Sequence, residues 1–275
     1  MTLAELIDEK EEVSLPIYTT GINFLDTPLG GGLQQGQIVT ITGDTESGKT
    51  QLLNQMIAHL AKNTKCLYIS LEFNKSQLKK HFRQKLQHKT VSQIALRNTI
   101  VITNEMIEGE ISILSETIIR HIYEDGVTHI GIDSALMLYH NCYTGEQEVT
   151  EIFRQLHQLA LAYNVTIFII AQGTKQDNKD NRVSIFGSQK ASHFPLVMLH
   201  LIYDRIQNQR KLIIAKNKQT GTYAEVNITL DKRQLLFKET QHQFQDTPIS
   251  TEDESANNTL DVQGVEKKQS LWEIL

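Results

Sequence analysis

The segment Gly43-Asp-Thr-Glu-Ser-Gly-Lys-Thr50 constrains this sequence more than any other feature. It fits the pattern GxxxxGK[ST], follows an apolar run at Ile38–Thr42 and precedes a stretch with helical apolar spacing. In that context, glycines let backbone N–H groups turn inward around phosphate oxygens, and the N-terminus of the helix favours the bound anion. The motif predicts a strand–loop–helix unit that binds a nucleoside triphosphate through Gly43, Asp44, Thr45, Glu46, Ser47, Gly48, Lys49 and Thr50.

The residue types at the end of this motif suggest separate roles. We expect the Lys49 ammonium to reach the β- and γ-phosphates of ATP and the Thr50 hydroxyl to ligate Mg²⁺. Asp133 ends the apolar run Thr128–Asp133, so at the carboxyl edge of a parallel sheet it would face the phosphates and hold Mg²⁺, usually through water. A helix-capping aspartate is the alternative reading.

Two more polar residues follow apolar runs. Glu72 comes directly after Tyr68–Leu71 and would polarise the attacking water, unless it is only a solvated side chain. Gln172 ends the next run, where its amide would sense the γ-phosphate or satisfy a backbone group.

Apolar β-branched runs alternate with amphipathic stretches from Ile38 onward, which predicts an α/β fold. Such alternation is typical of a mainly parallel central sheet with helices on both faces. Three closing runs lack helices between them and predict a C-terminal antiparallel hairpin extension. The parallel strands are expected at Ile38–Thr42, Lys65–Leu71, Thr99–Thr103, Thr128–Asp133, Val165–Ala171 and Val197–Tyr203, and the antiparallel ones near Lys211–Ala215, Tyr223–Leu230 and Leu235–Phe237.

Charge divides the 275 residues into three parts. The net charge is −5, but residues 239–275 carry eight acids and two bases, and the first twelve carry five acids and one base. The middle of the chain is therefore mildly basic, which permits contact with nucleic acid. We expect an N-terminal amphipathic helix and linker at 1–15, an ATPase domain at 16–238 and an acidic, disordered tail at 239–275.

The composition also bears on location. No apolar run approaches the ~18 residues needed to cross a bilayer, and the N-terminus does not read as a signal peptide. Cys66 lies in an apolar run and Cys142 in a polar segment, which makes a disulfide improbable. We expect a cytoplasmic protein.

Segments around the phosphate motif carry a family resemblance. Thr20–Asp26, Leu29-Gly-Gly-Gly-Leu33 and Gly36 resemble the opening of RecA-like ATPases, a group that includes DnaB-type replicative helicases, RadA and KaiC. Ser70-Leu-Glu72 is similar to the DnaB and KaiC segment, which implies that Glu72 is the catalytic base. Ala171-Gln172 resembles the strand end that couples the state of ATP to DNA loops.

The segment Ile213-Ile-Ala-Lys-Asn-Lys-Gln-Thr-Gly221 points most narrowly to the DnaB branch and to minimal plasmid and phage helicases. It resembles a lysine–x–arginine segment whose basic residues reach the ATP of the neighbouring subunit. Lys216 matches that lysine, whereas Lys218 replaces the arginine with a point charge that lacks a bidentate fork. The resemblance implies a homohexamer in which Lys216 and Lys218 act in catalysis. A solvated hairpin tip is the alternative.

Contacts with DNA and partners rest on three further segments. Gly173–Gly187 reads as a long polar loop without regular structure, and the resemblance places it beside a channel where Lys175, Lys179, Arg182 and Lys190 would meet single-stranded DNA. Residues 3–12 resemble a linker helix that docks on a neighbour. The Leu271–Leu275 tip would bind a protein partner or the chain's own DNA channel, unless the tail only aids solubility.

Taken together, these features predict an ATP- and Mg²⁺-dependent, ring-forming helicase or translocase that acts on single-stranded DNA in replication. Two other classes stay open: a RecA- or RadA-like recombination ATPase that binds single strands, and a KaiC-like regulatory ATPase without a DNA role.

Overall fold

The computed structural model of the chain describes residues 15–87, 91–107, 110–138, 145–175, 183–185 and 187–240. Several expectations lie outside this part of the chain and stay predictions. They concern the helix at residues 3–12, the side chains of Lys179 and Arg182, and the Leu271–Leu275 tip.

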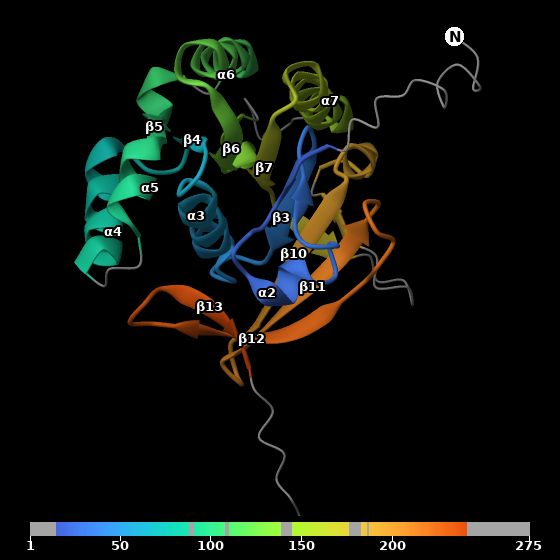
Figure 1. Cartoon of the computed structure of the whole chain (residues 1–275). Coiled ribbons are helices and arrows are strands. Elements are labelled where there is room, and N and C mark those ends of the chain that lie inside the picture. Colours follow the sequence, from blue (N-terminus) through green and yellow to red (C-terminus); the bar gives the residue numbers. More distant parts are fainter. Residues whose placement is uncertain are drawn as a thin grey trace, which may run out of the picture. The chain divides into compact units, whose positions relative to one another are not determined.

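The described residues build a nine-stranded mixed sheet in the order β13-β12-β11-β10-β3-β7-β6-β4-β5 (Figure 1). The strands from β10 to β5 are parallel to one another, and β11, β12 and β13 add antiparallel pairs at one end. This confirms the predicted α/β class with its C-terminal antiparallel extension. The strand bounds are β3 Ile38–Gly43, β4 Lys65–Ser70, β5 Thr99–Thr103, β6 Val127–Asp133, β7 Thr166–Ile170, β10 Val197–Asp204, β11 Gln209–Asn217, β12 Glu225–Asp231 and β13 Leu236–Glu239.

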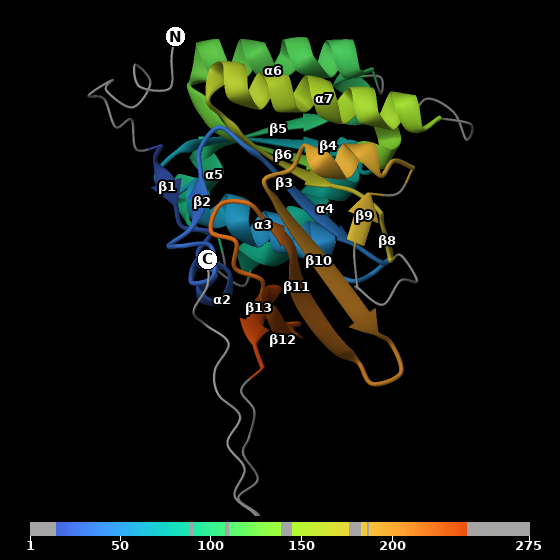
Figure 2. The same cartoon turned by 90° about the vertical axis from the view of Figure 1, so that its right-hand side faces the viewer.

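Helices cover both faces of this sheet, as Figure 2 shows. One face carries α3 (Lys49–Leu60) with α4 (Lys75–Gln87) and α5 (Gln93–Asn98), and the other carries α6 (Ile111–Asp125) and α7 (Glu146–Tyr163). The short α2 (Asn23–Asp26) precedes the sheet. Apolar side chains three or four residues apart give each long helix one buried stripe, and that stripe packs on the sheet.

Strand β4 shows why the central strands read as continuous apolar runs. Leu67 and Ile69 belong to the apolar cluster beneath α6 and α7, while Cys66 and Tyr68 belong to the cluster beneath α3. Successive strand residues point to opposite faces, and both faces are covered here. Full burial of each large aliphatic side chain stabilises the fold by about 1.5–3 kcal/mol.

The structure corrects the expectation for Gly173–Gly187. This segment is not without regular structure, because β8 (Gly173–Lys175) pairs in antiparallel fashion with β9 (Val183–Ile185). The polar composition hid the hairpin, since its two strands have only three residues each. A second short pair, β1 (Ile17–Tyr18) with β2 (Leu33–Gln34), was also not predicted.

Across the described residues, each helix is too short or too polar to span a lipid bilayer.

Candidate nucleotide-binding site

The phosphate-binding motif forms a loop that two later strands hold tightly. Gly43 has a φ of +144°, and a Cβ there would lie 2.2 Å from the carbonyl oxygen of Leu201 in β10. Gly48 has a φ of +104°, and a Cβ there would lie 2.6 Å from the ring of Phe237 in β13. Both positions require glycine because of the backbone conformation and of the close approach.

The helix that follows this loop begins with free amide groups. Its N-cap residue, Gly48, has no side chain that could bond the first turn of α3, so the N–H groups there stay available to an anion. The Lys49 Nζ donates hydrogen bonds to the carbonyl oxygens of Gly43 (2.9 Å) and Asp44 (2.7 Å). Partial burial lowers the pKa of Lys49, whereas the nearby carboxylates of Glu72, Asp44 and Asp133 act in the opposite direction.

A pocket of about 440 Å³ opens beside this loop and collects the residues that the sequence singled out. Thr45, Glu46 and Gly48–Thr50 line it from the loop and from α3. The ends of β4, β6 and β7 contribute Glu72, Asp133 and Gln172, since the carboxyl ends of parallel strands meet at one edge of the sheet. The strand ends therefore bring together five candidate residues: Lys49, Thr50, Glu72, Asp133 and Gln172.

Asp133 is the buried acid of the pocket, with 1% of its surface exposed. The Tyr68 hydroxyl donates a 2.8 Å hydrogen bond to its Oδ2, while Oδ1 has no hydrogen-bond partner among the described residues. Burial raises the pKa of Asp133 to about 6, and the hydrogen bond from Tyr68 opposes this rise. A buried carboxylate oxygen without a partner, close to the Thr50 hydroxyl, is a fitting donor set for Mg²⁺ or its bound water.

Glu72 extends into the pocket as an exposed side chain directly after β4. The Ser134 hydroxyl donates a 2.5 Å hydrogen bond to its Oε1 and so restrains its orientation. Ser134 follows Asp133 and lies next to Glu72 because β4 and β6 are neighbours in the sheet. The sequence did not single out Ser134, because only this strand pairing connects it with Glu72.

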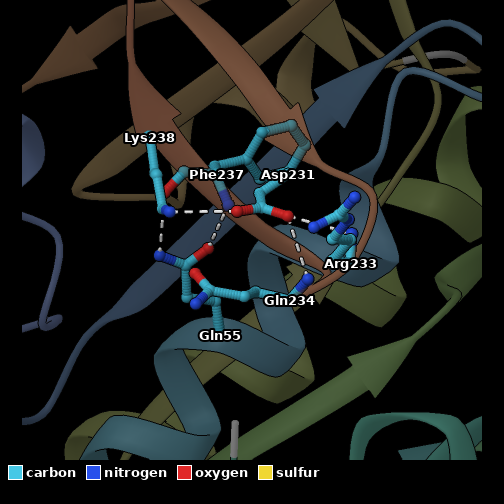
Figure 3. Close-up of polar contacts among 6 residues, drawn as sticks. All are labelled: Gln55, Asp231, Arg233, Gln234, Phe237 and Lys238. Atoms are coloured by element: carbon cyan, nitrogen blue, oxygen red, sulfur yellow. Dashed lines mark hydrogen bonds and ion pairs between the residues drawn. The ribbon is translucent and has the colours of Figure 1, made fainter. Parts of the chain in front are cut away.

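The hairpin of β12 and β13 forms a further side of the site that sequence reasoning missed. Leu230 of β12 lines the pocket, and Phe237 of β13 packs against Gly48. Figure 3 shows how Gln55 of α3 holds this hairpin, with its side-chain amide facing the backbone of Phe237. At the hairpin's turn, Asp231 accepts hydrogen bonds from the backbone N–H groups of Arg233 and Gln234 and from Lys238. No local motif marks these contacts, which span 182 residues of sequence for Gln55 and Phe237.

Lys216 and Lys218 lie far from the pocket of their own chain. Lys216 is opposite Met198 in the β10–β11 pair, and Met198 is opposite Thr40 of β3, three residues before the phosphate loop begins. The Lys216 Nζ donates hydrogen bonds to the carbonyl oxygens of Ser192 (2.6 Å) and His193 (3.1 Å). Burial and the neighbouring charge of Lys218 lower the pKa of Lys216 to about 8. The basic pair therefore lies toward the amino ends of the parallel strands, away from the phosphate edge.

The turn that carries Lys218 is held to the start of the chain. The Gln219 side chain donates hydrogen bonds to the carbonyl oxygens of Leu29 (2.6 Å) and Gly32 (2.8 Å), and Asn217 bonds the carbonyl oxygen of Pro28. Lys218 itself is exposed. The side chain is thus free in solvent on a backbone that is fixed.

The candidate DNA-binding residues are only partly described. Lys175 ends β8, and Lys190 is an exposed residue that begins the short 3-10 helix Lys190–His193. Lys179 and Arg182 lie outside the described residues, so the structure does not bring the four together as one surface.

Comparisons with known proteins agree with this geometry. Residues 18–229 match the family model for the KaiC ATPase. The DNA repair protein RadA of Campylobacter jejuni is 30% identical over 224 residues, which is 80% of this chain and 46% of that protein. The recombination protein RadB of Methanococcoides burtonii is 26% identical over 216 residues, 75% of this chain and 92% of that protein. This chain thus spans about half the length of the RadA protein that it matches.

Solved structures show the same fold at low identity. A KaiC-like protein from Pyrococcus horikoshii aligns with a TM-score of 0.64 and 15% identity, covering 82% of this chain and 100% of that one. The solved ATPase domain of another protein aligns with a TM-score of 0.67 and 16% identity, covering 87% and 97%. With the phosphate loop, the strand-end carboxylates and the sheet order on one frame, the chain belongs to the KaiC family of RecA-like P-loop ATPases.

Proposed function

We propose that this ATPase is a ring-forming motor that hydrolyses ATP at subunit seams and moves on single-stranded DNA. The observation that carries the proposal is the separation of two sets of charges. Among the described residues that line the phosphate pocket, Lys49 is the sole cation, while Lys216 and Lys218 lie toward the opposite edge of the sheet. A triphosphate leaves more negative charge than one lysine balances, so a second copy that presents its basic pair would complete the site.

Each residue of the pocket has a defined part in this proposal. The free amides of the first turn of α3 and the Lys49 ammonium hold the phosphates, and Thr50 and Asp133 hold Mg²⁺, which neutralises charge that develops on the phosphate oxygens. Glu72, oriented by Ser134, accepts a proton from the attacking water. Gln172 lies at the same edge, one residue before the β8–β9 hairpin, so its amide joins the pocket to that hairpin.

The direction of assembly follows from the same separation. A contact between the phosphate edge of one copy and the basic pair of the next is head-to-tail, and such contacts close into rings when the rotation permits. We propose a homohexamer on this basis. The β8–β9 hairpin, with Lys175 on β8, would face the DNA that passes through the ring.

A recombination ATPase that coats single strands is the second candidate. The similarity to RadA and RadB favours it, because those relatives are a DNA repair protein and a DNA repair and recombination protein. Such a protein would form open filaments and pair strands instead of separating a duplex. The two candidates share the seam geometry and differ in closure.

Mixing two inactive variants tests the seam. Lys49→Ala removes the phosphate contact, and the Lys216→Ala/Lys218→Ala pair removes the basic residues, so each variant alone should hydrolyse little ATP. In an equimolar mixture about a quarter of the seams would combine an intact Lys49 with an intact basic pair, and ATP hydrolysis should return accordingly. A mixture as inactive as its components would refute the seam.

Electron microscopy with ATP and single-stranded DNA then separates the two candidates, since closed rings and open filaments are readily distinguished. Strand displacement from a forked duplex should accompany rings. ATP hydrolysis that does not respond to single-stranded DNA would contradict both candidates and favour a regulatory ATPase.

A further inference from the structure

The aromatic residue beneath the metal site carries a hydroxyl that its packing does not require. Tyr68 is 1% exposed in the middle of β4, and its ring makes an edge-to-face contact with Phe82 at 5.9 Å between centroids. A phenylalanine would fill the same space. A buried hydroxyl costs free energy unless it is hydrogen-bonded, and the partner here is Asp133.

Strand register explains how the two residues meet. Tyr68 is directly opposite Gly131 of β6, and Asp133 is opposite Ser70, two residues further along the same face. Gly131 offers no side chain to Tyr68, so the phenol reaches along the strand to the carboxylate. A Cβ on Gly131 would lie 3.2 Å from Leu53 of α3, which shows that this place is already filled from the helix side.

The hydrogen bond distinguishes the two oxygens of Asp133. Oδ2 accepts the Tyr68 proton at 2.8 Å, and Oδ1 has no hydrogen-bond partner among the described residues. A phenol with its ordinary pKa near 10 is protonated at neutral pH and stays a donor. The carboxylate is thereby fixed in rotation, with one oxygen left for a cation or its water.

We propose that Tyr68 is a positioning residue for Mg²⁺, which it serves by holding Asp133 Oδ2 and leaving Oδ1 to the metal. This inference rests on the proposed nucleotide function. Groups that orient a metal-binding carboxylate typically change metal affinity by about 10–100-fold when removed.

The test compares Tyr68→Phe with the wild type and with Tyr163→Phe, a control on α7 outside the pocket. Binding of a fluorescent ADP is measured first in EDTA and then during titration with Mg²⁺, all in the full chain. We expect Tyr68→Phe to bind the nucleotide in EDTA as the wild type does, and to need about tenfold more Mg²⁺ for half of the metal-dependent gain in affinity. Tyr163→Phe should match the wild type in both conditions.

Two results would overturn the inference. One is an unchanged Mg²⁺ requirement in Tyr68→Phe. The other is an equal loss of affinity in EDTA and in Mg²⁺, which would mean that Tyr68 supports only the fold. If the wild type itself binds no nucleotide with or without Mg²⁺, the proposed function fails as well, and that outcome is seen without any variant.

Discussion

The side-chain amide of Gln55 pairs with both backbone polar groups of Phe237. Its Oε1 accepts from the Phe237 N–H at 2.8 Å, and its Nε2 donates to the Phe237 carbonyl oxygen at 3.2 Å. Gln55 lies one and a half turns into the helix that follows the phosphate loop, whereas Phe237 belongs to the last strand of the sheet. The amide thus acts like an added strand residue that fastens β13 to α3.

Replacing Gln55 by leucine should loosen this attachment. Both hydrogen bonds are lost, and the backbone groups of Phe237 lose their partner, so we expect a loss of about 1–3 kcal/mol in the free energy of unfolding. Chemical denaturation measures it. Gln93→Leu, at an exposed position of α5, is the matched control and should change little. Equal stabilities of the two variants would contradict the assigned role.

Substitution of Gly48 by alanine should abolish nucleotide binding. The new Cβ would meet the Phe237 ring at 2.6 Å, and the φ of +104° is one that side-chain-bearing residues rarely adopt. The Phe237→Ala change, added to Gly48→Ala, removes the clash but not the backbone strain, so it should not restore binding of a fluorescent nucleotide. Gly145→Ala has open space around its Cβ and serves as the control.

The buried carboxylate of Asp133 should make stability depend on pH. Burial raises its pKa to about 6 from an ordinary 3.8, so the folded state binds the proton more tightly than the unfolded state does. The free energy of unfolding of the nucleotide-free protein should therefore fall as pH rises from about 4 to about 6, and then level off.

The Asp133→Asn variant removes this contribution while its amide oxygen still accepts from Tyr68. At pH 8 we expect it to be more stable than the wild type by about 1–3 kcal/mol, although it should lose Mg²⁺-dependent hydrolysis. Denaturation curves at pH 5 and pH 8 measure the effect, with Asp125→Asn on α6 as control. A less stable Asn variant at pH 8 would show that the charge of Asp133 is compensated.

The Glu72→Gln variant should separate binding from turnover. Glutamine keeps the shape and can still accept from Ser134, but it cannot take a proton from water. We expect ATP affinity within about twofold of wild type and a kcat lower by about 10²–10⁴-fold, measured by nucleotide titration and single-turnover hydrolysis. Glu105→Gln, outside the pocket, is the control. Normal turnover in Glu72→Gln would remove this residue from the role of base.

Changing Lys218 to arginine should increase hydrolysis if the seam is correct. A guanidinium offers a planar fork for two phosphate oxygens where the ammonium offers one point charge. We expect a several-fold higher kcat in the presence of single-stranded DNA. Lys232→Arg, an exposed residue of the β12–β13 turn, gives the comparison. If both variants behave alike, Lys218 does not contact the transition state.

The core of the site could be predicted because each of its residues follows a readable local pattern. Lys49 and Thr50 belong to a motif, and Glu72, Asp133 and Gln172 each follow an apolar strand, so the parallel arrangement alone brings them to one edge. Nothing in the comparisons or the structure tests their chemical roles, which stay proposals. The six central strands were predictable for the same reason, since burial on both faces leaves a continuous apolar run.

The missed features depend on contacts between distant segments or on weak patterns. Ser134 and Tyr68 gain their partners only through the β4–β6 register, and Phe237 gains its place through Gln55. The helix α4 was not predicted because its sequence is largely polar, with Leu78 as its one buried apolar side chain among those described. Strands β8 and β9 are too short to show the alternation that marks a strand.

The two glycine contacts of the phosphate loop also order events during synthesis. The loop is complete as a peptide at Thr50, yet the strands that press on Gly43 and Gly48 are made some 150 and 190 residues later. A chain emerging from the ribosome therefore carries its nucleotide motif long before it can shape it. Capture of ATP is delayed until β13 is in place, so the nucleotide can act as a final clamp on a finished fold instead of a template for an early one.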